Sequence, residues 1–210
     1  ETPCLTISKT NNTSNISAKS VSKIVLTKQD IENSGYINLT DILKNIGGID
    51  VYQSGHIGQS SSVFIRGSES NHTLVLLNGI AINDSSVTDG MHDFGQDFVQ
   101  SIQQIEIYKG SAGAHFGPSA MAGAINFITT INYNNNYSIS GFDGRNSSVN
   151  GNYTKVTDNA WHLNINATGN QSNLGSATAD GTEDDGTFNK QLNLNVEKWI
   201  NDNTKVRSTF

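Results

Sequence analysis

The feature that most restricts this chain is a strict alternation of apolar and polar side chains in its C-terminal third. In the run 161–167 every odd-numbered residue is apolar, and every even-numbered residue is His or Asn. The run 192–197 repeats the pattern with Asn and Glu at the polar positions. A period of two residues gives a β-strand one apolar and one polar face. About ten such residues between turns are typical of a transmembrane barrel strand, although a soluble β-sandwich produces a similar pattern.

The connections between these runs differ in length. Segments 157–160 and 201–203 are short, whereas 170–186 is long and polar. Outer-membrane barrels have short periplasmic turns and longer extracellular loops. If the first strand starts on the periplasmic side, both short turns fall on that side and the long loop lies outside. Of the 27 Asn residues, 17 lie from Asn132 onward, so we expect a second kind of structure over 132–210.

Residues 21–131 mix helix and strand signals, which predicts a compact α+β domain. Thr27 and Asp30 have the spacing of a capping box, so a short helix is expected to about Asn33. Asn38 or Thr40 is expected to cap a second helix. Asn78-Gly79 between two apolar runs predicts a β-hairpin. We expect further strands at 21–26, 49–52, 62–67, 105–109 and 124–129, a helical turn at 99–103 and a loop at 111–123.

The composition excludes several classes of function. A net charge of −6 with scattered basic residues argues against a nucleic-acid partner. No run reaches the roughly 18 apolar residues of a spanning helix. The single Cys4 offers no disulfide or metal pair and is expected to be an incidental free thiol. Metal-ligand, phosphate-loop and nucleophile motifs are missing, so we expect no enzyme. Residues 1–20 are polar and predict a flexible arm, with any signal peptide already removed.

Three stretches of residues 21–131 stand out by their order and spacing. They are Leu39–Leu43 through Val51, Phe64–Gly67 with Leu76–Gly79, and Ile105–Gly110 through Phe116-Gly117 to Ala122–Thr129. Together they resemble the plug domain of TonB-dependent receptors. Within that family the chain most resembles the cobalamin receptors, in the loop length of 53–67 and in Asp185, Gly186 and Lys190. Siderophore receptors share most of the plug motifs.

The resemblance implies an α+β plug domain followed by antiparallel β-strands of an incomplete transmembrane β-barrel. The barrel of such transporters has about 22 strands, and Phe210 lies partway into the fifth. An open edge would leave backbone groups unpaired in lipid. We therefore expect a truncated chain or gene fragment, with a 1–20 arm, a 21–131 plug and 132–210 as the first barrel strands.

The resemblance also implies coupling to the periplasmic protein TonB through a short N-terminal box. That box adds as an extended strand to its partner and needs backbone hydrogen bonds more than particular side chains. An arbitrary piece of the arm remains the alternative. The candidate box consists of Leu5, Thr6, Ile7, Ser8 and Lys9.

Ligand contacts are expected from two small, polar plug loops, although bland surface loops would have the same composition. Plug–barrel ion pairs are expected at Arg66, Glu106 and Lys109, the last of which is usually arginine in the family. Lysine keeps the charge but loses the bidentate geometry. The candidate ligand residues are Gln53, Ser54, His56, Gln59, Ser60, Asn83, Ser85 and Ser86.

Four acidic residues lie close together in the long loop. Carboxylates at this density suit calcium, which orders such loops in the cobalamin receptors, yet the spacing is not that of an EF-hand. A solvated acidic loop is the alternative, and no other cofactor is expected. The four residues are Asp180, Glu183, Asp184 and Asp185.

Together these features predict an outer-membrane protein that imports a scarce nutrient with energy supplied through TonB. The expected partners are TonB, outer-membrane lipid, and cobalamin or a ferric siderophore as ligand. No chemistry on the ligand is implied. The alternatives are a siderophore receptor instead of a cobalamin receptor, and a secreted or surface β-rich adhesin without transport.

Overall fold

The computed structural model divides the chain into two compact units. The plug unit comprises the described residues from 22 to 129, and the strand unit comprises residues 4–9 together with those from 135 onward. The structure describes residues 4–9, 22–36, 38–55, 58–87, 89–97, 99, 102–110, 113–129, 135–142, 146–158, 160–172, 186–201 and 204–209.

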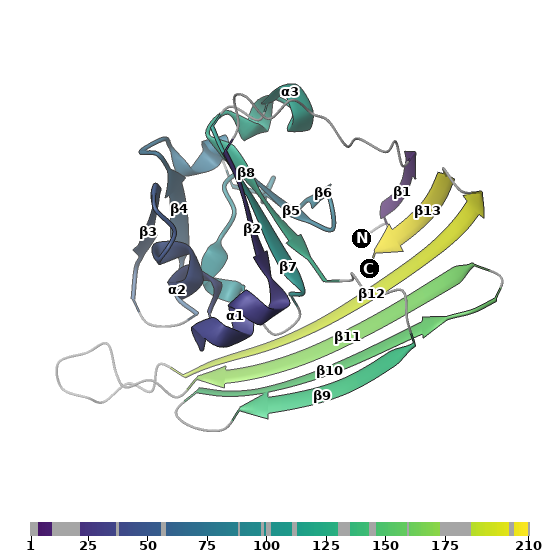
Figure 1. Ribbon diagram of the computed structural model, residues 1–210. Helices are drawn as coiled ribbons and strands as arrows, with labels where there is room; N and C mark the ends of the chain where they lie inside the picture. The colour runs from purple at the N-terminus through teal and green to yellow at the C-terminus, as the bar shows by residue number, and fades with distance from the viewer. Residues whose placement is uncertain are drawn as a thin grey trace. The chain divides into compact units, whose positions relative to one another are not determined.

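The plug unit is built on a five-stranded mixed sheet (Figure 1). Its order is β2-β7-β8-β5-β6, in which β5 and β8 are parallel and the other neighbours are antiparallel. The turn between β5 and β6 has positive φ at Asn78 and Gly79, as the predicted hairpin requires. The strands are β2 (Ser22–Thr27), β5 (Thr73–Leu77), β6 (Ile80–Ala81), β7 (Gln104–Lys109) and β8 (Gly123–Ile128).

Two short helices follow the first strand. In α1 (Lys28–Ser34) the Thr27 hydroxyl accepts the Asp30 amide, and the Asp30 carboxylate accepts the Thr27 amide. This confirms the predicted capping box, a device that contributes about 1 kcal/mol. The N-cap of α2 (Leu39–Lys44) is Asn38, without a side-chain cap bond. The alternative at Thr40 is therefore wrong, because Thr40 is already inside the helix and buried.

The remaining plug elements are a two-stranded sheet and short helices. Strand β3 (Ile49–Gln53) pairs antiparallel with β4 (Ser61–Ile65). The prediction of a strand to Gly67 was wrong, because Arg66 and Gly67 have positive φ and end the extended backbone. The prediction of a loop at 111–123 was also wrong in part, since Pro118 starts a 3₁₀ turn there. The short helices are η1 (Ser70–His72), η2 (Phe94–Gln96), α3 (Gly113–Phe116) and η4 (Pro118–Ala120).

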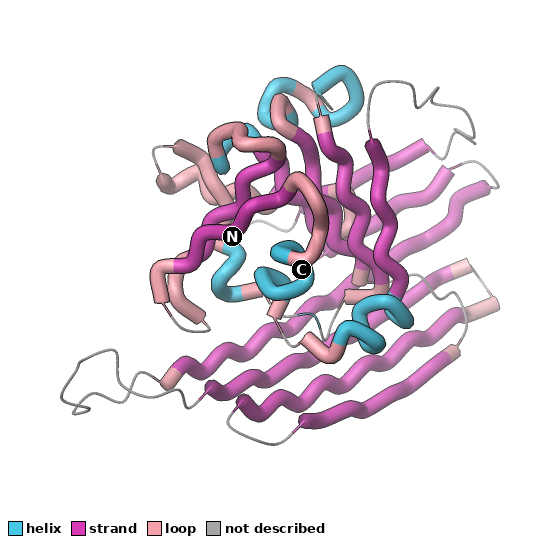
Figure 2. Tube along the Cα trace, turned by 60° about the vertical axis from the view of Figure 1, so that its left-hand side comes forward, coloured by secondary structure: helices cyan, strands magenta, loops and turns pink. Residues whose placement is uncertain are grey.

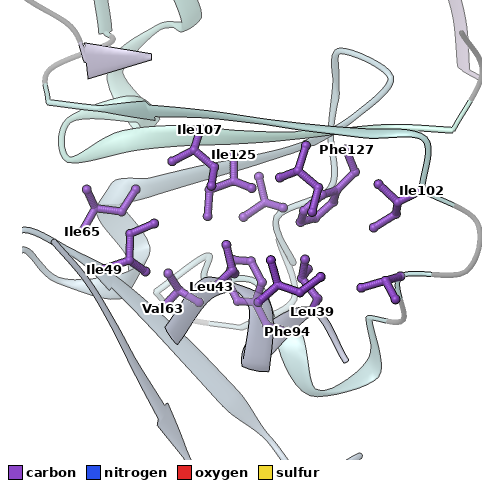
Figure 3. Packing of buried hydrophobic residues seen from close by; sticks show 14 of the residues in the cluster. Leu39, Leu43, Ile49, Val63, Ile65, Phe94, Ile102, Ile107, Ile125 and Phe127 are labelled. Carbon is purple, nitrogen blue, oxygen red and sulfur yellow. The ribbon is translucent and has the colours of Figure 1, made fainter. Parts of the chain in front are cut away.

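The core of the plug unit lies between its sheet and α2 (Figure 3). Ile107 of β7 and Ile125 of β8 are fully buried, as are Leu39 and Leu43 of α2. Phe94 enters the same cluster from the loop after β6. This loop is therefore anchored in the core at one point.

The strand unit is a single antiparallel sheet, drawn as a curved layer in Figure 1 and as long tubes in Figure 2. Its described part has the order β1-β13-β12-β11-β10-β9. It forms one layer, unlike the two packed layers of the β-sandwich alternative. The strands are β1 (Cys4–Lys9), β9 (Asn136–Phe142), β10 (Asn146–Val156), β11 (Trp161–Ser172), β12 (Thr187–Asn201) and β13 (Thr204–Thr209).

The two faces of this sheet have opposite chemistry, as the alternation predicts. One face, called the outer face here, exposes Ile139, Leu192 and Phe188 at 82%, 68% and 64%. On the other face Asn164, Asn166 and similar side chains are buried. The antiparallel strands β9–β13 agree with the expectation of a second region of antiparallel β-strands after an α+β domain. No helix among the described residues has the length and apolarity to cross a membrane.

Candidate functional site

Two plug loops that carry predicted ligand residues are joined to each other. The carboxylate of Asp93 accepts the backbone amide of Ser61 at 2.8 Å and that of Gly95 at 2.9 Å. Gly95 also lies so close to Gln59 that an added Cβ would overlap the Gln59 carbonyl oxygen. The loop after β3 and the loop after β6 therefore form one braced surface.

Asn83 organises the second loop. Its side-chain oxygen accepts the Val75 amide at 2.7 Å, and its side-chain nitrogen donates to the carbonyls of Thr73 and Gly90, both at 3.1 Å. Hence the carboxamide faces its own domain and ties the loop to β5. A ligand contact by this side chain stays a prediction, and its observed role is positioning.

His92 connects two ends of the same loop through hydrogen-bond distances to Ile82 and Asp97. Its Nε2 lies 2.7 Å from the Asp97 carboxylate, and its Nδ1 lies 3.3 Å from the Ile82 carbonyl. Burial lowers the pKa of His92, but the hydrogen bonds to Asp97 and Ile82 and the nearby negative charge outweigh it and raise the pKa above its usual value. The ring also packs edge-on against Phe94.

The other predicted ligand residues are mostly on the surface of these loops. Gln53 is half-buried and accepts the Lys44 ammonium at 3.4 Å, while the Ser54 amide donates to the Ser60 carbonyl and narrows the first loop. Ser86 donates its backbone amide to the Asp84 carboxylate at 2.8 Å. His56 lies outside the described residues. The exposed members of the set are Ser54, Gln59, Ser60, Ser85 and Ser86.

Sequence reasoning missed two exposed apolar side chains beside these serines. Tyr52 at the end of β3 is 66% exposed, and Val87 in the second loop is 38% exposed. The signal was present for Tyr52, because Ile49 and Val51 point inward and the period of two turns Tyr52 outward with Asp50. An exposed aromatic next to small polar groups suits recognition of a large ligand with apolar faces.

The residues predicted to form plug–barrel ion pairs have contacts within the plug unit. Glu106 accepts the Lys23 ammonium at 2.9 Å and also hydrogen bonds from Tyr108 and Asn126. Burial raises the pKa of Glu106, but these donors outweigh burial and lower it below its usual value. Lys109 donates to the Gly47 carbonyl at 2.8 Å, and Arg66 is exposed. Pairing with a barrel wall stays a prediction for all three.

The candidate TonB box forms a strand in the structure. Residues 4–9 are β1, which pairs antiparallel with β13 from Cys4 opposite Thr209 to Lys9 opposite Thr204. The expectation of a flexible arm is therefore wrong for 4–9, because the edge of β13 offers backbone groups with which an extended segment can pair.

The acidic residues Asp180, Glu183, Asp184 and Asp185 lie outside the described residues, so the calcium prediction has no geometric test. In the described part of the chain, no three His, Cys, Asp or Glu side chains come together as metal ligands. Three charged groups of the strand unit, Glu197, Lys205 and Arg207, instead form an ionic cluster. In it the Glu197 carboxylate lies 2.7 Å from Arg207 and 3.2 Å from Lys205.

Comparison with known proteins places these features in a family. The vitamin B12 transporter BtuB of Vibrio vulnificus (strain CMCP6) is 45% identical over 109 residues, which are 52% of this chain and 18% of the transporter. The ferric yersiniabactin uptake receptor FyuA of Yersinia pestis has a TM-score of 0.68 at 18% identity, over 90% of this chain and 30% of the receptor. The siderophore receptor PirA of Acinetobacter baumannii has a TM-score of 0.69 at 20% identity, over 91% of this chain and 31% of the receptor.

These coverages mean that the chain spans about a fifth to a third of the length of the relatives it matches. The two solved structures share its fold across both units. The model of the TonB-dependent receptor plug domain matches residues 15–124, which contain both braced loops and all of the predicted motifs except the end of the third, 125–129. On this match over half of its length, the chain belongs to the TonB-dependent receptor plug domain family.

Proposed function

We propose that this chain supplies the plug and first barrel strands of an outer-membrane receptor that imports a cobalamin by a TonB-dependent mechanism. The observation that carries the proposal is the 45% identity to a vitamin B12 transporter over 109 residues. The receptors FyuA and PirA are 18% and 20% identical and support the fold alone.

The geometry of the braced loops supports ligand binding at this surface. The backbone of both loops is held in place by contacts of Asp93, Asn83 and Gly95. The exposed Ser54, Ser60 and Ser85 are therefore attached to ordered backbone. A pre-ordered loop loses less conformational entropy when a ligand binds. Tyr52 would offer a stacking surface to the ligand, and the serines would supply hydrogen bonds.

TonB would engage the chain at residues 5–9. The pairing of β1 with β13 supports this step, because residues 4–9 pair there as an extended strand, the conformation that strand addition uses. Force on the arm would then rearrange the plug and open a path. The ligand itself would pass without chemical change, as in a transporter and not an enzyme.

Direct binding tests the ligand. The full-length protein, purified in detergent, should bind cyanocobalamin at micromolar concentration or tighter, and Tyr52→Ala should weaken binding about tenfold as an interface aromatic is lost. Tyr36→Ala, at an exposed tyrosine after α1, is the matched control and should bind normally. Binding of a ferric siderophore but not of cyanocobalamin would contradict the assignment to cobalamin and favour the siderophore alternative.

Cross-linking tests the coupling segment. A cysteine at Ile7, in a Cys4→Ser background that removes the native thiol, should cross-link to a cysteine-bearing TonB more strongly when cyanocobalamin is present. A cysteine at Ser22 in β2 is the control and should not respond. If the Ile7 cross-link is absent or insensitive to ligand, residues 5–9 are not the TonB box.

A further inference from the structure

The outer face of the strand unit contains a hollow that the proposed function does not use. It has a volume of 610 Å³ and lies over strands β9 to β12. Its floor is made by Gly151 and Ala167, with Gly169 beside them, and its rim includes Ile139 and Leu192. The strands involved, β9 to β12, are four consecutive strands of the curved sheet in Figure 1.

The strand register explains the hollow. Gly151 pairs with Ile139 on one side and Ala167 on the other, and Ala167 pairs with Leu192. These four residues form one row across the strands on the outer face, in which the small Gly151 and Ala167 lie between the large Ile139 and Leu192. The neighbouring row on one side is filled, since it contains Tyr153, Ile165 and Leu194. In the row on the other side, Gly169 lies between Val149 and Lys190.

The backbone does not need these glycines. Neither Gly151 nor Gly169 has a positive φ, and a Cβ built on either would meet no atom within 4 Å. Glycine in a strand interior weakens the strand, and it commonly marks a bulge or a place that a ligand approaches closely. Strand pairing is regular through both positions, so the glycines mark no bulge and leave open space on the outer face.

The chemistry of the lining defines the occupant. Ile139, Val149 and Leu192 expose apolar surface at 82%, 57% and 68%, which suits a hydrocarbon chain. Lys190 lines the same hollow and lies over the Phe188 ring, 4.8 Å from its centroid. Among the described residues no carboxylate pairs with Lys190. An apolar hollow with one cation at its edge is complementary to an acyl chain that ends in an anionic group.

We propose that this hollow binds one acyl chain of an anionic membrane phospholipid, whose phosphate is held by Lys190. The inference rests on the proposed function to the extent that this sheet spans a membrane. It goes beyond general contact with lipid, because it assigns the phosphate to one lysine of the outer face and not to another. Lys198 also lies over an aromatic ring, Trp161, at 4.8 Å, but it does not line the hollow.

The test uses the full-length protein reconstituted in bilayers of phosphatidylcholine with a minor fraction of phosphatidylglycerol. Native mass spectrometry measures how much phosphatidylglycerol stays bound after release from the bilayer. Lys190→Gln should reduce this retention about fivefold, the factor expected from one lysine near anionic lipid. Lys198→Gln should leave it nearly unchanged. Equal losses in the two variants would show general surface attraction and overturn the proposal.

A second pair of variants tests the hollow itself. Gly151→Leu and Gly169→Leu each add side-chain volume where no atom lies within 4 Å, so each should preserve the strand and reduce retention of phosphatidylglycerol at least tenfold. Gln171→Leu, on the same face outside the hollow, is the control. Normal retention in both glycine variants would overturn the proposal. If the wild-type protein does not insert into bilayers, the proposed function fails as well, whereas insertion without lipid selectivity contradicts this inference alone.

Discussion

The plug unit and the strand unit use the same period of two residues in opposite ways. In the plug unit Ile105, Ile107 and Ile125 are fully buried between layers. In the strand unit Leu192 and Ile139 are mostly exposed, whereas Asn164 and Asn166 are buried. The alternation tells which side chains share a face, but the solvent on each side decides which face is apolar.

Cross-strand hydrogen bonds connect part of the buried polar face of the strand unit. Asn150 donates to Thr168 at 2.7 Å, Asn164 donates to Thr154 at 3.0 Å, and Asn195 donates to Asn164 at 3.4 Å. The plug core instead contains apolar groups at the equivalent depth. We therefore expect the two units to respond differently to the same kind of substitution.

The largest effect should come from the plug core. Ile107→Ala removes a fully buried side chain between β7 and α2, and such truncations cost about 2–5 kcal/mol. Hydrogen exchange of β7 and β8 amides in the full-length protein measures the local free energy of opening. Val25→Ala, at a 42% exposed position on the neighbouring strand, should cost about 0.5 kcal/mol or less. Similar losses of opening free energy in both variants would contradict a core that lies between the sheet and α2.

The next effect tests the outer face of the strand unit. Leu194→Lys places a charge on the apolar side of β12, which should cost about 2–4 kcal/mol near the middle of a bilayer. Gln191→Lys, on the opposite face, should cost about 0.5 kcal/mol or less. Urea unfolding in phospholipid vesicles, followed by the fluorescence of Trp161 and Trp199, gives both values. If Gln191→Lys is the more costly change, the faces have been assigned the wrong way round.

The elements that sequence predicted correctly depend on local rules. Thr27 with Asp30 and Asn78 with Gly79 each specify a cap or turn within four residues, and the structure has both. The alternation in β11 and β12 predicted the two faces of the sheet. The end of β4 at Ile65 was missed because Arg66 takes a positive φ, a conformation uncommon for a non-glycine residue.

The candidate site was less accessible to sequence reasoning because its order depends on contacts between distant residues. Asp93 reaches Ser61 across 32 positions, and Asn83 bonds Val75 and Thr73 instead of facing outward. Nothing in a local pattern distinguishes such a positioning asparagine from a ligand contact. The pairing of β1 with β13 likewise joins residues almost a full chain length apart.

A smaller effect tests the first helix of the plug unit. Thr27→Ala removes the hydroxyl that accepts the Asp30 amide, and loss of an N-cap costs about 1 kcal/mol. The Asp30 amide should exchange faster by about fivefold, the factor that this free energy gives. Gln29→Ala, at an exposed position in the same helix, is the control because alanine keeps helix propensity. Unchanged exchange at Asp30 would show that the capping bond is not formed.

The smallest effect is a pH dependence confined to the second plug loop. His92 has acceptors at both ring nitrogens, Asp97 and Ile82, and only the protonated ring can donate to both. Because its pKa is raised in the folded protein, its contribution to stability is complete below the unfolded value of about 6.5 and is lost as pH rises through the folded pKa. Hydrogen exchange at Phe94 and Asp97 should therefore become faster at alkaline pH, beyond the intrinsic increase in amide exchange. Asp97→Asn removes the carboxylate that favours the charged ring, so it should abolish the extra increase in exchange rate with pH. Exchange in β9–β13 is the control and should show no extra increase. An equal pH response in Asp97→Asn and the parent protein would mean that the His92–Asp97 contact does not hold the loop.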